Sequence, residues 1–405
     1  MKAIPTWKQR KLTNLVSVIK SYPLSRSVET EKNTGVRYIH YGDIHTKRAD
    51  KITSKSNIPN INVGDYKYLE KDDLALADAS EDYQGIAMPS VIVEKTPFRI
   101  VAGLHTIALR PKTIEPLYLY YLIHSSTFRK YGYKVGTGMK VFGISKNNIL
   151  KFETLFPCIE EQTKISSLLN KIDDTIALHQ EKLSKLQSLK EAALQSLFPQ
   201  KNETEPKVRF ANFSSSWKQR KLGELVERVT RKNKNLDSTL PLTVSAQDGL
   251  VDQNEYFTKT VASRNVSNYY LLKKGEFAYN KSYSNGYPLG AIKRLDKYEK
   301  GVLSTLYVVF KPTYVNSDFL AKYYDSTHWY YEVYKHAAEG VRNHGLLNIS
   351  PSDFFSTELK VPKSYEEQSK IGIFINKLDN SIALHQQRLE KLQNCKKVFL
   401  QKMFI

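Results

Sequence analysis

Two stretches of the chain share one pattern of hydrophobic and polar positions. In residues 157–198 and again in residues 361–404, apolar residues recur in steps of three and four, which places them in a seam along one face of a helix. Between the paired glutamates and the end of each seam, Gly372 is the only glycine or proline. The positions off the seam are rich in Glu, Lys and Gln, which favour helix. The pattern predicts two helices of about 35–40 residues, each roughly 55 Å long.

The two long helices need a partner, because they are too polar to be buried inside a globular part. Tandem repeats can pack about a local two-fold axis, so we expect the helices to pair as an antiparallel coiled coil with pseudo-two-fold symmetry. His179 and His385 hold the same seam position. We hypothesise that they form a polar layer that fixes the register; the alternative is that each imidazole reaches water at the edge of the seam. The residues expected to pair the helices are Ile165, Leu169, Ile172, Ile176, His179, Leu183, Leu186, Ile371, Ile375, Leu378, Ile382, His385, Leu389 and Leu392.

The repeat extends beyond the helices. The hexapeptide Trp-Lys-Gln-Arg-Lys-Leu occurs at Trp7–Leu12 and again at Trp217–Leu222, so the chain is a duplication of a globular segment followed by a helix. Residues 199–216 are polar, contain two prolines and end in a serine run, as is typical of a linker. The expected domains are a globular part in 1–155, a helix in 156–198, the linker in 199–216, a second globular part in 217–360 and a helix in 361–405.

Inside each globular part the pattern alternates between short apolar runs and one aromatic helix. Strands are predicted at Val91–Val93, Thr106–Leu109 and Leu306–Phe310, helices at Leu117–Tyr131 and Phe319–His336, and an N-cap at Ser317 or Asp318. Each globular part therefore has α+β character.

The net charge of +20 and the pI near 9.5 indicate a polyanionic partner. A membrane surface is the competing interpretation, but no apolar run approaches the ~18 residues of a spanning helix, and the N-terminal sequence lacks a signal-peptide core. Nucleic acid is therefore the favoured partner. Cys158 and Cys395 are the two cysteines, which fits a reducing cytoplasm, and neither has a metal-ligand spacing.

Motifs for catalysis are missing from the sequence. No proline is followed by another proline, so the chain lacks the Asn/Asp-Pro-Pro-aromatic motif with which amino-methyltransferases hold a flipped base. No glycine-rich loop for S-adenosylmethionine or for a nucleotide phosphate is present, and no proline precedes an aspartate as in the usual nuclease motif. The nine histidines are scattered without metal-ligand spacing. We therefore expect no catalytic site and no metal site in this chain.

The order of these motifs resembles the specificity subunit (HsdS) of type I restriction-modification systems over nearly the whole length. The resemblance is carried by Pro157 with Glu160–Gln162, Pro362 with Glu366–Gln368, Pro206–Phe210 before Trp217–Leu225, and signatures like those of target recognition domains at Tyr38–Ile44 and Leu272–Phe277. One departure is the N-terminus, where Trp7 follows six residues without a counterpart of the segment Pro206–Phe213. This departure concerns a docking segment only.

The resemblance implies a non-catalytic reader of double-stranded DNA. Two target recognition domains would each hold one half of a split sequence, and the paired helices would set their separation. Two modification (methyltransferase, HsdM) subunits would assemble around the helices, bring S-adenosylmethionine and methylate adenine, and restriction (HsdR) subunits can join in such systems. This chain itself would bind no cofactor. Outer apolar positions such as Leu168, Leu189 and Phe374 would be open to docking subunits.

Candidate DNA contacts lie in polar or basic loops, because Lys and Arg bind phosphates while sequence is read by side chains that reach base edges. Solvated surface loops are the alternative interpretation of the same segments. The candidates in the first globular part are Lys47, Arg48, Ser80, Tyr83, Gln84, Lys134, Thr137 and Lys140; those in the second are Lys281, Ser282, Tyr283, Asn285, Tyr287, Lys335, Arg342, Asn343 and His344. Arg342 and Asn343 carry the groups that recognise guanine and adenine. Because the two sets differ, we expect an asymmetric target.

Two other classes of function compete with sequence reading. A coiled-coil scaffold could bind nucleic acid through its charge alone, with steep salt dependence and no sequence preference. An enzyme with its own methyltransferase or nuclease activity is disfavoured by the missing motifs.

Overall fold

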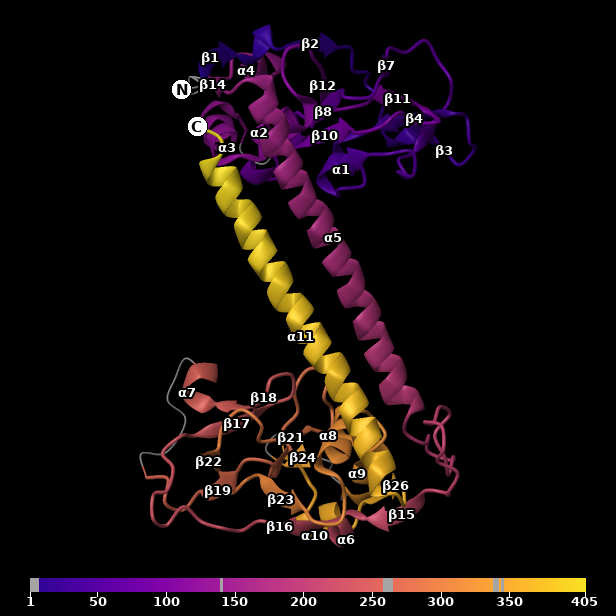
Figure 1. The fold of residues 1–405 in the computed structure, drawn as a ribbon, viewed down its shortest axis with the longest axis vertical. Helices are drawn as coiled ribbons and strands as arrows, with labels where there is room; N and C mark the ends of the chain where they lie inside the picture. The colour runs from indigo at the N-terminus through magenta and orange to yellow at the C-terminus, as the bar shows by residue number, and fades with distance from the viewer. Residues whose placement is uncertain (1–6, 139–140, 258–264, 338–341, 344–345) are drawn as a thin grey trace. The chain divides into compact units, whose positions relative to one another are not determined.

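The computed structural model describes residues 7–138, 141–257, 265–337, 342–343 and 346–405. The chain divides into two compact units, each with its own hydrophobic core. Unit 1 consists of Met1–Gln180 together with Gln387–Ile405, and unit 2 consists of Glu181–Gln386. Each unit therefore contains one globular part, part of the long helix that follows it and part of the other long helix (Figure 1).

The described part of unit 1 combines two five-stranded sheets with short helices. One sheet has the order β2-β12-β8-β10-β5 and the other the order β3-β6-β4-β11-β7. The α+β class expected from the sequence is thus confirmed. The bounds are β1 Lys8–Lys11, β2 Val16–Ile19, β3 Glu29–Thr30, β4 Val36–Ile39, α1 Tyr41–His45, β5 Lys51–Ile52, β6 Asn60–Ile61, β7 Tyr68–Leu69, β8 Leu74–Ala77, β9 Ala79–Ser80, β10 Pro89–Ile92, β11 Arg99–Ala102, β12 Thr106–Pro111, α2 Pro116–His124, α3 Ser126–Val135, β13 Phe142–Gly143, α4 Lys146–Leu150 and β14 Glu153–Phe156.

The described part of unit 2 repeats this plan with fewer paired strands. Its largest sheet has the order β16-β23-β20-β21. The bounds are β15 Lys218–Lys221, α6 Leu222–Leu225, β16 Val226–Arg228, β17 Leu242–Ser245, β18 Gly249–Asp252, α7 Gln253–Tyr256, β19 Tyr270–Lys273, β20 Phe277–Asn280, β21 Ala291–Arg294, β22 Lys300–Leu303, β23 Val308–Pro312, α8 Ser317–Asp325, α9 Tyr330–His336, β24 Arg342–Asn343, β25 Leu346–Leu347, α10 Pro351–Phe355 and β26 Glu358–Val361.

The two long helices are α5, Ile159–Ser196, and α11, Tyr365–Lys402, each of 38 residues, as the hydrophobic pattern predicted. In unit 1, α5 begins beside the globular part and α11 ends beside it. Phe404, just beyond α11, packs on Tyr118 of α2 with ring centroids 5.1 Å apart. Lys396 of α11 pairs with Asp173 of α5 at 2.5 Å. The segments of the two helices within unit 1 therefore run antiparallel.

Unit 2 shows the same arrangement with the helices exchanged. Lys190 of α5 pairs with Asp379 of α11 at 2.6 Å. Asp379 and Lys190 hold the positions of the repeat that Asp173 and Lys396 hold in unit 1. Ala193 and Leu197, near the end of α5, lie in one core with the first seam residues of α11. The duplicated contacts are those expected of an antiparallel pair with pseudo-two-fold symmetry.

The repeated hexapeptide forms the first strand of each unit. In unit 1, β1 pairs antiparallel with β14 in the register Lys8↔Phe156, and in unit 2, β15 pairs with β26 in the register Lys218↔Val361. β14 and β26 each lead directly into a long helix, so these strand pairs fix where the helices leave their globular parts.

The aromatic helices differ from the prediction, because each one is broken in two. Residues expected as one helix at 117–131 form α2 and α3, separated by Ser125, whose side chain accepts the backbone N–H of Phe128 and so begins a new helix. Residues expected at 319–336 form α8 and α9, which are separated by residues 326–329, and no side chain caps the start of α9. The predicted N-cap was also wrong, because Asn316 and not Ser317 or Asp318 caps α8.

Candidate nucleic-acid interface

The loops that the sequence nominated in unit 1 lie next to one another. β9 pairs with β13 in the register Phe142↔Ser80, which joins the connection after β8 to the segment after α3. The ring Nε2 of His45, at the end of α1, lies 2.8 Å from the carbonyl oxygen of Ala79. Three segments that are distant in sequence thus form one surface. We call this surface, made of residues 45–48, 79–84, 134–138 and 141–143, the unit 1 loop surface.

Aromatic rings stand at the centre of the unit 1 loop surface. Tyr83 lies against Phe142 with centroids 3.9 Å apart and meets Tyr133 edge to face at 6.0 Å. Tyr83 and Tyr133 keep 42% and 44% of their surface exposed. Aromatic faces at a groove can contact bases or the thymine methyl group. The sequence nominated Tyr83 but missed Tyr133 and Phe142.

Arg129 of α3 holds the segment that contains Tyr83 in place by donating to its backbone carbonyl oxygens. Arg129 of α3 donates from Nε to the carbonyl oxygen of Ile123 at 2.7 Å and from Nη1 to that of Gln84 at 3.2 Å, and it also donates to that of Ile86. Burial lowers the pKa of Arg129 to about 10. These contacts and the hydrogen bond from the backbone N–H of Gly85 to the Asp82 carboxylate hold the segment in place, while the side chain of Gln84 is exposed to solvent.

The remaining candidates of unit 1 have different surroundings. Ser80 is buried, and its hydroxyl oxygen accepts the backbone N–H of Asp82 at 3.3 Å, so it positions the loop. Lys134 and Thr137 are exposed, and Thr137 exchanges backbone hydrogen bonds with Gly143 of β13. Lys140 lies outside the described residues.

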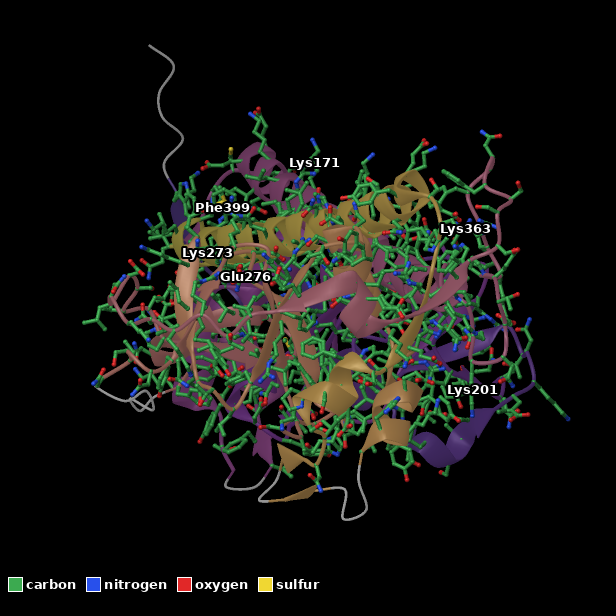
Figure 2. All side chains as sticks on the ribbon, turned by 90° about the horizontal axis from the view of Figure 1, so that it is seen from below. Lys171, Lys201, Lys273, Glu276, Lys363 and Phe399 are labelled. Carbon is green, nitrogen blue, oxygen red and sulfur yellow. The ribbon has the colours of Figure 1, made fainter. Side chains whose placement is uncertain are left out.

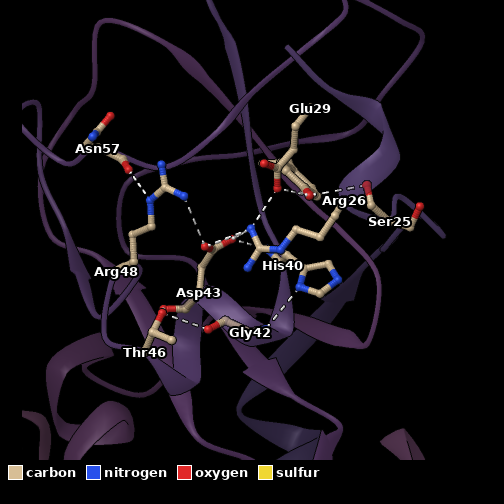
Figure 3. Close-up of polar contacts among 10 residues, drawn as sticks. Ser25, Arg26, Glu29, His40, Gly42, Asp43, Thr46, Arg48 and Asn57 are labelled. Atoms are coloured by element: carbon tan, nitrogen blue, oxygen red, sulfur yellow. Dashed lines mark hydrogen bonds and ion pairs between the residues drawn. The ribbon is translucent and has the colours of Figure 1, made fainter. Parts of the chain in front are cut away.

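Arg48 belongs to a network of charges around α1 (Figure 3). Its Nε donates to the carbonyl oxygen of Asn57 at 2.6 Å, and its Nη1 lies 3.7 Å from Asp43. Asp43 is 1% exposed and also receives two hydrogen bonds from Arg26 at 3.1 Å. The network fixes the start of α1, while the side chain of Arg48 remains 42% exposed. Lys47 is exposed as well.

The pKa values of Glu29 and His40 in this network lie below their ordinary values. Burial alone would raise the pKa of Glu29, but hydrogen bonds from Arg26 and Tyr38 lower it. Burial and the charge of Arg26 lower the pKa of His40. A neutral His40 accepts the N–H of Gly42 through Nδ1 at 3.1 Å, which completes the N-terminal turn of α1.

Unit 2 places its candidate loops at the equivalent position. The connection between β20 and β21 carries Lys281–Tyr287, and the backbone N–H of Leu347 in β25 donates to the carbonyl oxygen of Lys281 at 3.0 Å. β25 in turn pairs with β24, which contains Arg342 and Asn343. The two candidate segments of unit 2 are thus joined by backbone pairing. We call residues 281–287, 342–343 and 346–347 the unit 2 loop surface.

The side chains of the unit 2 loop surface vary in exposure. Tyr283 is 59% exposed, Asn285 is exposed, and Ser282 and Tyr287 are half-buried. Lys281 is half-buried and donates from Nζ to the carbonyl oxygen of Ile349 at 3.2 Å. The side chains of Arg342 and Asn343, and all of His344, lie outside what the structure describes.

Lys335 is the candidate that the structure places elsewhere. It lies in α9, its Nζ is 3.9 Å from Glu332, and it lines a pocket of about 190 Å³ with Lys201 and Lys360. This pocket faces the linker and contains no residue of the unit 2 loop surface. Lysines project from many other elements too: Figure 2 labels Lys171 on α5, Lys201 in the linker, Lys273 on β19 and Lys363 before α11. Charge alone therefore does not single out a reading surface.

Side chains suited to a metal are not gathered in the residues that the structure describes, where no three His, Cys, Asp or Glu residues could hold an ion. Within the same residues, no helix is long and apolar enough to cross a membrane.

Comparison with known proteins relates the first part of the chain to one family. Residues 5–188 match the family described as type I restriction modification DNA specificity domain. Residues 5–188 of this chain are therefore similar to a type I DNA specificity domain. The description of the matched family supports a part in DNA-sequence recognition.

One solved structure supports the same fold over the whole length of this chain, and two others are similar to it. The S subunit of a type I restriction-modification system from M. genitalium is 15% identical, with a TM-score of 0.59 over 100% of this chain and 98% of that chain. The HsdS subunit from Thermoanaerobacter tengcongensis is 14% identical over 99% of this chain and 97% of that chain, with a TM-score of 0.47. A chain from a structure concerned with assembly of the type I restriction-modification system is 14% identical over 99% of this chain and 98% of that chain, with a TM-score of 0.47.

Proposed function

We propose that the two loop surfaces read the two halves of a split and asymmetric DNA target. The observation that carries the proposal is that both units build the same kind of surface at the same place in the fold. In each unit, the connection that follows an inner strand, β8 or β20, joins a distant loop through short backbone pairing. The scaffold is repeated, whereas the side chains on it differ. Equal scaffolds with different side chains favour two different half-sites over a palindrome.

Aromatic and polar side chains would read the first half-site, and basic and amide side chains the second. Tyr83, Gln84 and Thr137 expose groups that can reach base edges in unit 1. Lys134 and Arg48 would contact phosphates. In unit 2, Tyr283 and Asn285 are exposed beside the strand of Arg342 and Asn343.

The chemistry on DNA would be performed by partner subunits in the cytoplasm. The described residues provide no metal cluster, and the sequence lacks the motif that holds a flipped base. Two modification subunits would bring S-adenosylmethionine and methylate adenines, and restriction subunits could join the same complex. The long helices would carry these subunits and set the distance between the half-sites.

Replacing both Arg342 and Asn343 with Ala tests the assignment of the second half-site. We expect one half of the methylated sequence to become relaxed or lost while the other half stays intact, because each lost bidentate contact removes about 1–3 kcal/mol of discrimination against the wrong base. The measurement is the genome-wide pattern of methylated adenines in cells that express the chain with its modification partner.

Lys297→Ala provides the matched control for this experiment. Lys297 is exposed in the turn between β21 and β22, so its replacement removes one charge without changing the unit 2 loop surface. An unchanged second half-site in the double variant would contradict the assignment.

A further inference from the structure

The segment before the second repeat, residues 206–213, covers one face of unit 2. Arg209 forms a bidentate ion pair with Glu367 of α11, from Nε to Oε1 at 2.6 Å and from Nη2 to Oε2 at 2.9 Å. The side chain of Glu367 is fully buried by this contact and by Trp217, whose Nε1 donates to Oε1 at 3.3 Å. Phe210 meets Phe374, two helical turns further along α11, with centroids 5.8 Å apart.

The covering segment closes over an apolar groove. The groove has a volume of about 280 Å³ and is walled by Val208, Arg209 and Phe210 of the segment, by Phe374 of α11 and by the last turns of α5, including Leu189 and Ala192. The Arg-Phe pair of the segment thus combines one buried charge contact with one aromatic contact on a helical face.

In unit 1 the same face has no such cover among the residues that the structure describes. Glu161 is the equivalent of Glu367 and likewise accepts a hydrogen bond from a tryptophan, Trp7, at 3.3 Å. Among the described residues, however, no Lys or Arg forms an ion pair with Glu161. Leu168, the equivalent of Phe374, is 38% exposed, and Val398 of α11, the equivalent of Ala192, is 43% exposed. Phe399, labelled in Figure 2, is the neighbouring apolar residue on α11.

We propose that this face of unit 1, formed by Glu161, Leu168 and Val398, binds an extended segment of a partner chain in which an arginine is followed by an aromatic residue. Unit 2 shows the chemistry that the face accepts, because its own copy is filled by Arg209 and Phe210. The guanidinium would pair with Glu161 in two parallel hydrogen bonds, and the ring would lie on Leu168.

Other occupants fit the face less well. Residues 1–6, Met-Lys-Ala-Ile-Pro-Thr, contain neither an arginine nor an aromatic residue. A second copy of this chain would have to release its own Arg209 from Glu367, which would leave a fully buried carboxylate without its charge partner. A different chain that carries a free Arg-aromatic segment does not incur this cost.

A peptide with the sequence of residues 203–216 tests the proposal directly. We expect the fluorescent peptide to bind the full chain saturably at one site, measured by fluorescence anisotropy. Glu161→Gln in the chain and Arg209→Ala in the peptide should each weaken binding about tenfold or more, because a hydrogen bond to a charged group contributes about 1.5–3 kcal/mol and 1.4 kcal/mol is tenfold. Glu160→Gln is the matched control and should leave the affinity within about twofold, because Glu160 is exposed and pairs only with Lys164.

Cross-linking locates the bound peptide. A photo-reactive benzophenone at position 210 of the peptide should attach to the part of α5 around Leu168. Attachment around Phe374 instead would show that the peptide displaces the chain's own segment and would overturn the proposal. Binding that appears only after residues 1–6 are removed would show that these residues are the occupant, and it would also overturn the proposal, as would affinity insensitive to Glu161→Gln.

Discussion

Gln162 and Gln368 show why the repeated Glu-Glu-Gln stands at the start of both long helices. The amide nitrogen of each donates to a proline carbonyl oxygen, that of Pro157 or Pro362, at 2.9 Å. The amide oxygen of each accepts the backbone N–H of the residue that caps an aromatic helix of the same unit, that of Glu115 before α2 at 2.9 Å and that of Asn316 before α8 at 2.7 Å. One side chain therefore ties three elements together, with its donor and its acceptor both buried and satisfied.

Glu367→Gln should strongly destabilise unit 2. Its carboxylate is fully buried against Arg209, and removing one partner of a buried ion pair leaves the other charge uncompensated, which costs about 3–5 kcal/mol. Chemical denaturation measures the free energy of unfolding. Glu366→Gln is the matched control, because Glu366 is 70% exposed in its contact with Lys370 and its replacement should change stability by less than about 1 kcal/mol. Equal effects of the two substitutions would contradict the prediction.

His124 should make unit 1 less stable in weak acid. Burial lowers the pKa of His124 to about 3, below the ordinary value of 6.5, and its Nδ1 lies 2.9 Å from the carbonyl oxygen of Tyr120. The unfolded chain takes up a proton as the pH falls through 6.5, whereas the folded chain does not. Stability is thus fully present above this pH and declines below it by up to about 1.4 kcal/mol per pH unit.

Denaturation at pH 7.5, 6.5 and 5.5 measures this decline. In His124→Gln the part of the decline that belongs to His124 should vanish, because an amide does not titrate. An identical slope in the variant and the natural chain would contradict the assignment.

At the residue scale, the sequence predicted which loops carry candidate side chains better than it predicted what each side chain does. It nominated Tyr83 and Gln84 because they lie in a polar loop, but the Arg129 contact that holds this loop joins residues about forty positions apart and leaves no local pattern. Ser80 was nominated for the same reason as Tyr83 and is buried. The exposure of a side chain within a loop depends on which distant strand pairs with the loop, and the sequence of the loop does not reveal that pairing.

At the scale of elements, the long helices were predictable and the aromatic helices were only partly so. A seam of 38 residues repeats its signal many times, so single exceptions such as Gly372 do not obscure it. The break at Ser125 rests on one side-chain cap without glycine or proline, and a capping serine looks like any other serine in a polar stretch. Short helices are therefore set by caps that the hydrophobic pattern does not reveal.

Lengthening both long helices should lengthen the unread gap in the DNA target. Seven residues inserted after Gln180 and seven after Gln386 preserve the seam and add about 10.5 Å of helix, or roughly three base pairs of DNA. Methylation mapping should show both half-sites unchanged and farther apart. Seven polar residues inserted after Lys201, in the linker, are the control and should leave the gap unchanged. An altered half-site with an unchanged gap would contradict the role of the helices as a spacer.

At the scale of the whole molecule, the net charge of +20 predicts that affinity for any duplex falls steeply with salt. Sequence reading adds a second expectation, that the ratio between the affinities for target and scrambled DNA persists as salt rises. Titrations from 50 to 200 mM salt measure both quantities for the chain with its modification subunits. A ratio near one at every salt concentration would favour a non-specific scaffold.

The division of the helices between the units has a consequence for synthesis of the protein. Phe404 lies in the core of unit 1 with Leu12 and Tyr118, and the hydroxyl of Thr127 donates to its carbonyl oxygen at 2.7 Å. The N-terminal part of the chain therefore cannot complete its core until residues as late as Phe404 have been made and released. Contacts between such distant residues form slowly, so the nascent chain carries exposed apolar surface until these residues emerge. Replacing Phe404 with a polar residue would therefore damage unit 1 more directly than unit 2, although unit 2 is nearer in sequence.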